Sequence, residues 1–177
     1  MGKNWSTVEL LRHVRHDYLN QIQLIKGNLA LNHCDRIEQI IDDIIVKAKN
    51  DAHLCNLNMP QVAEQLLTFS YESHFFELDY EIVGDVCTMM CLDQSLYDFQ
   101  SYLFQRIDQQ ENQQWENELY LFYQCTNGTL YVQYEFEGER NIQDIDQYFT
   151  QNASPLRIIH YEVTNNGFEL KLEAKCD

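Results

Sequence analysis

The stretch RHDYLNQIQLIKGNL, Arg15–Leu29, decides the fold of the N-terminal part of this chain. Apolar residues in and around it recur every three or four positions, which is the spacing of one face of an α-helix. Written as a heptad, the two core positions hold Val8, Arg15, Ile22 and Leu29, and Leu11, Tyr18 and Ile25. At roughly 100° per residue, His16 points about 145° away from this stripe. We therefore expect a helix that displays His16 on the side opposite its own apolar seam.

A second helix is expected directly after the first. The first pattern runs from about Trp5 to Leu31, and Asp35 is a plausible N-cap for the next helix. The apolar stripe of that second helix consists of Ile37, Ile40, Ile41, Ile44, Ile45, Ala48 and Ala52. The resulting hairpin has an apolar strip too broad for two helices to cover. A second copy would cover it, which predicts a homodimer with a four-helix bundle across a two-fold axis.

The helical pattern breaks at Pro60, because proline disfavours helix at the residue before it. We place the domain boundary there, with a helical hairpin over residues 1–57 and an α/β domain over residues 58–177. Helices are expected over Gln61–Phe76, Asp93–Gln110 and Ile142–Phe149, and strands over Leu78–Val83, Leu119–Cys125, Leu130–Phe136, Ile158–Val163 and Phe168–Leu172. Asn127-Gly128 and Asn165-Asn166-Gly167 predict two hairpin turns. The fold class is therefore α+β, with a C-terminal sandwich of helices on one face of a mixed sheet.

Charge and composition exclude several kinds of protein. A net charge of −16 argues against nucleic-acid binding, which needs a basic surface to release counterions. Residues 1–31 nevertheless carry +2, which leaves −18 for the rest and suits a first helix that meets an acidic or anionic partner. No apolar run approaches the ~20 residues of a membrane span. The six cysteines form no CxxC pair and no apolar leader precedes Trp5, so we expect a soluble, cytoplasmic protein with reduced thiols.

His16 and its neighbour Asp17 suit nucleophilic chemistry. A neutral imidazole nitrogen is nucleophilic near pH 7, and the phosphoramidate that it forms can pass its phosphoryl group on. Asp17 could accept a hydrogen bond from the other ring nitrogen and so orient the ring. Adjacent His and Asp residues are common by chance, so this pair needs a longer motif to support it.

The longer motif is LLRHVRHDYLNQIQLIKGNL, which closely resembles the phosphorylatable helix of the sporulation initiation phosphotransferase B family. It also resembles, more loosely, sensor-kinase helices with a His-Asp-aromatic-x-Asn pattern. Weaker similarity continues through DRIEQIIDDIIVKAK and LTFSYESHFFELDYEIVG. The resemblance implies a phosphorelay phosphotransferase in which His16 takes a phosphoryl group from the aspartyl phosphate of one response regulator and gives it to a second.

The same resemblance implies a dimeric bundle and a C-terminal domain like a degenerate kinase ATP-binding domain. The sequence supports the degeneracy, because it has no GxG or DxGxG motif and no asparagine in Asp93–Gln110 to reach magnesium and phosphates. We therefore expect transfer without ATP-dependent autophosphorylation. No cofactor or metal is expected on this chain, and Mg²⁺ would arrive with the regulator during transfer.

The resemblance also assigns roles on the first helix. His16 is the phosphorylated residue, Asp17 orients it, and Arg12 or Arg15 could steady phosphoryl oxygens. Arg15 could equally set the register of the bundle. The surface expected to dock the regulator holds His13, Asn20, Gln23, Leu24 and Gly27.

Other interpretations stay open at this point. His13 and His16 could form half of a metal site, although no further ligands cluster near them in the sequence. The protein could be an autophosphorylating kinase, or a module that binds regulators without carrying phosphate. His33, His53, His74 and His160 are expected to be structural. Cys87 and Cys91 are expected in a hydrophobic turn against the sheet, and Tyr120, Tyr123, Tyr131 and Tyr134 at half-buried strand positions.

Overall fold

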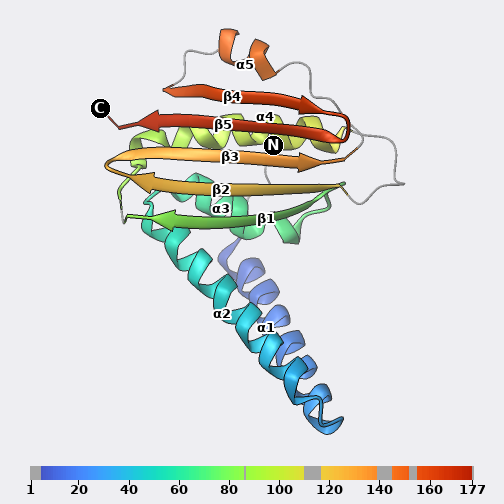
Figure 1. The fold of residues 1–177 in the computed structure, drawn as a ribbon. Coiled ribbons are helices and arrows are strands. Elements are labelled where there is room, and N and C mark those ends of the chain that lie inside the picture. Colours follow the sequence, from blue (N-terminus) through green and yellow to red (C-terminus); the bar gives the residue numbers. More distant parts are fainter. Residues whose placement is uncertain (1–4, 86, 110–116, 139–144, 152–154, 177) are drawn as a thin grey trace. The chain divides into compact units, whose positions relative to one another are not determined.

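A computed structural model describes residues 5–85, 87–109, 117–138, 145–151 and 155–176 (Figure 1). The chain divides into two compact units, Met1–Ala52 and His53–Asp177. The helices are α1 (Thr7–Ala30), α2 (Cys34–Asn56), α3 (Pro60–Thr68), α4 (Asp93–Asp108) and α5 (Ile145–Gln151). Short 3₁₀ turns, η1 (Phe69–Tyr71) and η2 (Met90–Leu92), follow α3 and precede α4. Within the described residues no helix has the length and hydrophobicity that crossing a membrane requires.

The first unit is a helical hairpin. Only three residues separate α1 from α2, and Asn32 takes a positive φ of 55° in the turn between them. Asparagine tolerates this left-handed conformation well. Helix α2 begins at Cys34, where the first backbone bond runs from Ile37 N–H to His33 C=O. The prediction that Asp35 caps α2 is therefore wrong, since Asp35 lies in the first turn, where its carboxylate faces the positive end of the helix dipole.

The second unit begins inside the last turns of α2, because Leu54 and Leu57 are buried in the same hydrophobic core as the sheet. Helix α3 starts at Pro60, whose missing N–H is not needed in a first turn. Its N-terminus is capped from another helix, since Asp93 Oδ1 accepts hydrogen bonds from Gln61 N–H at 3.1 Å and Val62 N–H at 3.0 Å. These contacts join α3 to α4.

The prediction of one helix over Gln61–Phe76 is wrong in its second half. Helix α3 ends at Thr68, and the chain then turns so that the His74 ring stacks on Phe69 at 3.8 Å between ring centroids. Residues five apart in a helix point about 140° from each other, so an unbroken helix could not make this stack. Burial of the aromatic rings of Phe69 and Phe76 against the core thus overrides the helical periodicity.

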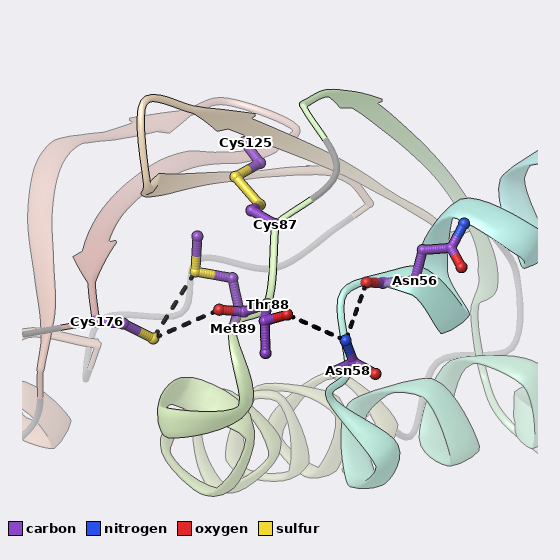
Figure 2. The surroundings of a disulfide bond; sticks show 7 residues. All are labelled: Asn56, Asn58, Cys87, Thr88, Met89, Cys125 and Cys176. Carbon is purple, nitrogen blue, oxygen red and sulfur yellow. Dashed lines mark hydrogen bonds between the residues drawn. A yellow bond between two sulfur atoms is a disulfide. The ribbon is translucent and has the colours of Figure 1, made fainter.

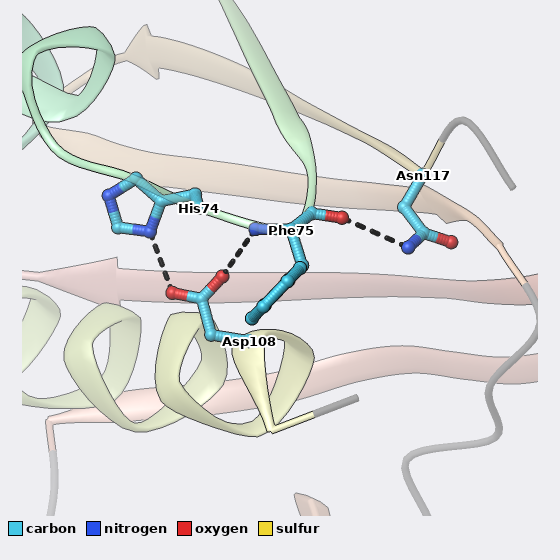
Figure 3. Close-up of polar contacts among 4 residues, drawn as sticks. All are labelled: His74, Phe75, Asp108 and Asn117. Atoms are coloured by element: carbon cyan, nitrogen blue, oxygen red, sulfur yellow. Dashed lines mark hydrogen bonds and ion pairs between the residues drawn. The ribbon is translucent and has the colours of Figure 1, made fainter. Parts of the chain in front are cut away.

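A polar network fixes the segment after this turn (Figure 3). His74 Nδ1 donates to Asp108 Oδ2 at 2.6 Å, and Asp108 Oδ1 accepts from Phe75 N–H at 2.9 Å. Asn117 Nδ2 donates to Phe75 C=O at 3.0 Å. His53 is likewise bonded within this unit, since its Nδ1 donates to Ile82 C=O at 3.0 Å. The contacts of both histidines agree with the structural role expected for them.

The sheet has the strand order β1-β2-β3-β5-β4, formed by β1 (Glu77–Gly84), β2 (Glu118–Thr126), β3 (Thr129–Glu137), β4 (Leu156–Thr164) and β5 (Gly167–Lys175). Strands β1 and β2 are parallel and the other pairs are antiparallel. Asn127 and Gly128 both have positive φ in the β2–β3 turn, as a two-residue hairpin requires. The expected mixed sheet and both expected hairpins are confirmed.

One face of the sheet forms the core. Alternate residues of β2 and β3 are buried, and Phe99 of α4 packs edge-on against Tyr134. Tyr123 and Tyr134 are fully buried, so they are more enclosed than predicted, and the Gln100 side-chain amide donates to both hydroxyls. Burial raises the pKa of both tyrosines. The first residues of the expected helix over Ile142–Phe149 lie outside the described residues.

The cysteines differ from the expectation of reduced thiols. Cys87 is bonded to Cys125 (Figure 2). Cys91 is bonded to Cys176, so only Cys34 and Cys55 are free. Cys87 and Cys91 are not bonded to each other. Their partners lie 38 and 85 residues further along the chain. The sequence could not indicate these pairs, because each depends on the ends of β2 and β5 meeting the segment between β1 and α4.

Candidate phosphoacceptor site on helix α1

Helix α1 has a well-defined start. Ser6 Oγ accepts from Glu9 N–H at 3.3 Å, and Glu9 Oε2 accepts from Ser6 N–H at 3.1 Å, which is a complete capping box. Such a cap supports a helix that gains little from tertiary burial. None of the residues of Thr7–Ala30, all of which the structure describes, is buried. Most residues of helix α1 are therefore exposed, and the rest are half-buried.

His16 lies on this helix with its ring accessible. Its side chain is 71% exposed. Asp17 Oδ1 lies 3.4 Å from His16 Nδ1, and Asn20 Nδ2 lies 3.2 Å from the same nitrogen. Both neighbours therefore hold Nδ1, which leaves Nε2 as the outward nitrogen.

Asp17 and Asn20 act differently on the tautomer of His16, because Asn20 Nδ2 as placed can only donate to an unprotonated Nδ1. A carboxylate can only accept, so pairing with Asp17 puts the proton on Nδ1 and leaves the Nε2 lone pair free. Asn20 fits the same state when its amide is turned to present the oxygen, because the two ends of an amide are interchangeable in shape. Asn20 was predicted only as a docking residue, and its position four residues after His16 is the signal that could have revealed this second role.

The other residues expected around His16 lie on the same helix but do not all point the same way. Arg12 and Arg15 are both exposed. Arg15 occupies one of the core positions of the heptad, next to the apolar residues of the stripe. His13 is half-buried, and its ring meets Trp5 edge-on at 5.1 Å between centroids. Among the residues that the structure describes, no three His, Cys, Asp or Glu side chains gather as a metal-binding set.

A shallow groove runs along α1 beside His16. Its lining includes four residues that were predicted to dock a regulator, namely Asn20, Gln23, Leu24 and Gly27, and two that sequence reasoning missed, Asn28 and Leu31. Asn28 and Leu31 continue the groove by one further helical turn, so their spacing could have indicated them. Leu24 is 57% exposed, and a Cβ added to Gly27 would meet nothing within 4 Å.

A second exposed feature of α1 is an open apolar stripe. We use this name for Val8, Leu11, Tyr18, Ile22 and Leu29, all of which are more than half exposed. They are five of the seven residues that the heptad placed at core positions; of the other two, Ile25 is half-buried and Arg15 is exposed. Large apolar side chains Ile41, Ile45 and Val46 are also exposed on α2. The hairpin therefore leaves several large apolar side chains exposed on both of its helices.

A capped helical hairpin that exposes His16 on its first helix, followed by a sheet with helices on one face, defines the class of histidine-containing phosphotransfer proteins related to sensor kinases. Two family models match the chain: the α-helical domain of the SpoOB-type sensor kinases over residues 3–57, and the C-terminal domain of sporulation initiation phosphotransferase B over residues 58–175. The sporulation initiation phosphotransferase B of Bacillus subtilis (strain 168) is 32% identical over 165 residues, which covers 90% of this chain and 84% of that protein. The chain belongs to the sporulation initiation phosphotransferase B family, whose members are phosphotransferases.

Two solved histidine kinase structures align with this chain. The kinase domain of a blue-light activated histidine kinase from Erythrobacter litoralis aligns with a TM-score of 0.46 at 11% identity, covering 66% of this chain and 58% of that one. The histidine kinase AdeS from Acinetobacter baumannii aligns with a TM-score of 0.46 at 10% identity, covering 90% of this chain and 97% of that one.

Proposed function

We propose that His16 accepts a phosphoryl group from the aspartyl phosphate of one response regulator and passes it to the aspartate of a second, within sporulation initiation. The observation that carries this proposal is the His16 ring, which is exposed on α1 while Asp17 and Asn20 hold its Nδ1. Membership of the phosphotransferase family supports it.

The chemistry balances in two steps. His16 Nε2 attacks phosphorus, the N–P bond forms, and the P–O bond to the donor aspartate breaks with its electron pair returning to that carboxylate. In the second step a carboxylate oxygen of the acceptor attacks, the N–P bond breaks and neutral imidazole is restored. The transition state is loose, so alignment and charge neutralisation supply most of the catalysis.

Within this scheme, Asp17 and Asn20 act as positioning residues. Asp17 selects the tautomer with the proton on Nδ1, and both residues restrict rotation of the ring. Asp17 also stabilises the positive charge that the ring acquires when Nε2 bonds to phosphorus. Arg12 and Arg15 are exposed on the same helix, and their side chains are long enough to reach phosphoryl oxygens or partner carboxylates.

The groove of Asn20, Gln23, Leu24, Gly27, Asn28 and Leu31 would dock each regulator in turn. Glycine in a helix interior costs about 1 kcal/mol relative to alanine. The chain has open space at Gly27, so packing within the chain does not explain this cost. Close approach of a partner backbone would explain it, and the exposed Leu24 would then be covered by the same partner.

The open apolar stripe would be covered by a second copy of the hairpin, giving a homodimeric four-helix bundle. On a helical wheel the stripe and His16 point in nearly opposite directions, so dimerisation would leave the histidine accessible. Both functions of the hairpin are therefore compatible on one pair of helices.

No cofactor is assigned to this chain. The regulator would bring Mg²⁺, which neutralises phosphoryl charge during transfer. The chain lacks the glycine-rich motifs of an ATP site, so the phosphoryl group would come from a regulator and not from ATP. We place this exchange in the cytoplasm, where response regulators act.

Two reactions with labelled phosphate test the proposal. The purified chain is mixed with labelled ATP in one reaction and with a labelled, phosphorylated response regulator in the other. We expect label on the chain only in the second reaction, and none in either reaction for His16→Gln. Because His16 is exposed, this variant should keep the folded dimer, which size-exclusion chromatography and circular dichroism check.

The alternative functions give different results. An autophosphorylating kinase would take label from ATP alone. A module that binds regulators without carrying phosphate would remain unlabelled in both reactions while still forming a complex. Label that persists in a folded His16→Gln variant would remove His16 as the acceptor.

A further inference from the structure

Two disulfides meet the segment between β1 and α4. Cys87 is bonded to Cys125 at the end of β2, and Cys91 is bonded to Cys176, which directly follows β5. We infer that Cys91–Cys176 is a thiol–disulfide exchange site for low-molecular-weight thiols, whereas Cys87–Cys125 is a protected bond. This inference concerns the second unit alone and stands independently of the chemistry at His16.

Access separates the two bonds. Cys91 is exposed and Cys176 is half-buried. Cys125 is only 1% exposed and belongs to the hydrophobic core, with Cys87 partly buried against it. Exchange requires a thiolate to reach a disulfide sulfur, so access controls its rate. A small thiol can therefore reach Cys91 in the folded protein, while Cys125 becomes reachable only when the core opens.

Chain length does not separate the two bonds in the same way. The bridged residues are 38 and 85 positions apart, and the entropy of closing a loop grows only with the logarithm of its length. The two disulfides therefore constrain the unfolded chain to a similar degree. A large difference in their reactivity would have to come from the folded structure.

Other contacts hold Thr88 and Met89, which lie between Cys87 and Cys91 (Figure 2). Met89 is buried, and its N–H donates to Leu57 C=O at 2.8 Å. Asn58 Nδ2 donates to Thr88 Oγ1 at 3.2 Å. These bonds and Cys87–Cys125 remain when Cys91–Cys176 opens. The segment would then keep its place, and the residue released would be Cys176.

Release of Cys176 would loosen the end of β5. The last pairs of this strand join Ala174 to Leu130 and Lys175 to Thr129 of β3. Cys176 Sγ also lies 3.9 Å from Met89 Sδ, a contact made at the edge of the core. Strand ends fray readily once they are untied. The reduced form would differ from the oxidised form mainly at this strand end.

The reaction conserves atoms and charge. One thiolate attacks a sulfur of Cys91–Cys176, giving a mixed disulfide and one protein thiolate, and a second thiol resolves the mixed disulfide. The products are two protein thiols and one low-molecular-weight disulfide, which has given up the two electrons. Re-oxidation consumes that disulfide in reverse. In a reducing compartment, disulfides that do form are usually transient or redox-sensing, which matches the accessible bond.

Timed alkylation in glutathione buffers tests the inference on the full chain. The oxidised protein is incubated with reduced glutathione, quenched with iodoacetamide and mapped by peptide mass spectrometry. Cys34 and Cys55 are exposed free thiols and serve as internal standards for labelling. We expect Cys91 and Cys176 to be labelled about tenfold or more faster than Cys87 and Cys125, because only the first bond is accessible. Oxidised glutathione should restore the bond.

Cys91→Ser and Cys87→Ser form a matched pair. In Cys91→Ser, hydrogen exchange at the end of β5 should match that of the partly reduced wild type, without further change on adding glutathione. In Cys87→Ser, Cys91–Cys176 should still open and close. If this variant does not fold, the labelling order in the wild type still decides the question. Equal labelling rates, earlier opening of Cys87–Cys125, or four thiols that oxidised glutathione does not join would each overturn the inference.

Discussion

The helical hairpin and the C-terminal unit use their apolar residues in opposite ways. Helix α1 has no buried residue over its whole length, and large apolar side chains such as Ile22 and Leu24 are 57% exposed. In the C-terminal unit the inward side chains of β2, β3 and β5 are almost completely buried under α3 and α4. The same kind of residue therefore remains exposed in one unit and forms a core in the other.

Because of this difference, we expect stability to depend mainly on the C-terminal core and function to depend mainly on α1. Substitutions in the C-terminal core should change the free energy of unfolding, whereas substitutions on α1 should change association and transfer with little effect on folding. A helix that forms interfaces needs exposed apolar residues, and a helix that carries a phosphoacceptor must be accessible to its partners. A helix with both roles cannot also be buried in its own chain. The predictions below test this separation, starting from the largest expected effect.

Ile22→Glu should abolish the dimer. Ile22 is part of the open apolar stripe, and two glutamates facing each other across a two-fold interface would be buried without partners. Analytical ultracentrifugation should show the dimer dissociation constant raised by about 1,000-fold or more, as expected for several kcal/mol of lost burial and unpaired charge. The thermal transition of the C-terminal unit should not move. An intact dimer would show that this stripe is not the interface.

Phe99→Ala should destabilise the C-terminal unit by about 3–5 kcal/mol, the usual cost of removing a fully buried phenylalanine. Phe99 contacts Tyr134, Tyr148 and Phe149, so the cavity would lie between α4 and the sheet. Urea denaturation measures the change. Phe75→Ala is the matched control, since the Phe75 side chain is half exposed and should cost less than about 1 kcal/mol.

Leu24→Glu makes the same substitution as Ile22→Glu on another face of α1. Leu24 lines the groove and not the open apolar stripe, so the variant should remain dimeric. Its rate of transfer from a phosphorylated regulator should fall about 10–100-fold, because one buried contact at a protein interface is commonly worth 1–3 kcal/mol. A normal rate would exclude the groove as the docking surface.

Asp17→Asn should slow phosphoryl uptake by about tenfold or more without preventing it, because the amide can still hold His16 Nδ1 but does not stabilise positive charge on the ring. Rapid-quench kinetics at saturating regulator isolate this chemical step from docking. Asn20→Ala is the companion variant, since it removes the other contact to Nδ1. Normal rates in both variants would show that the ring needs neither neighbour.

Gly27→Ala should give the smallest effect, but it should change two quantities in opposite directions: the stability of the hairpin should rise and the rate of transfer should fall. Alanine in a helix interior is more stable than glycine by about 0.5–1 kcal/mol, and a Cβ at this position meets nothing within 4 Å. The hairpin should therefore gain stability in thermal unfolding. Transfer should nevertheless slow several-fold if a regulator packs against this point. Faster or unchanged transfer would show that no partner approaches the backbone here.

The sequence predicted the elements that depend on local patterns. The 3–4 spacing on α1, the alternation on the strands and the Asn127-Gly128 turn all appear in the structure. Helix α1 is slightly shorter than expected, whereas each strand extends one to three residues beyond its expected bounds. The heptad also identified the open apolar stripe correctly, since its members share one face of the helix regardless of what covers them. The structure also has the expected contact between the Asp17 carboxylate and one ring nitrogen of His16.

Features that depend on distant residues could not be predicted. Helix α3 stops at Thr68 because Phe69 and His74 stack and Asp108, 34 residues further along the chain, binds His74. The two disulfides likewise require the order of strands in the sheet. The second contact to His16 Nδ1, from Asn20, needed only helical spacing, yet the docking role assigned to Asn20 obscured it.

We propose that the outward nitrogen of His16, Nε2, carries the phosphoryl group. NMR of the ¹⁵N-histidine-labelled chain, phosphorylated by a regulator, tests this directly through the coupling between nitrogen and phosphorus. We predict a single phosphohistidine, at His16, with phosphorus bonded to Nε2 and the proton retained on Nδ1. Phosphorus on His16 Nδ1, on His13 or on any residue other than a histidine would contradict the account.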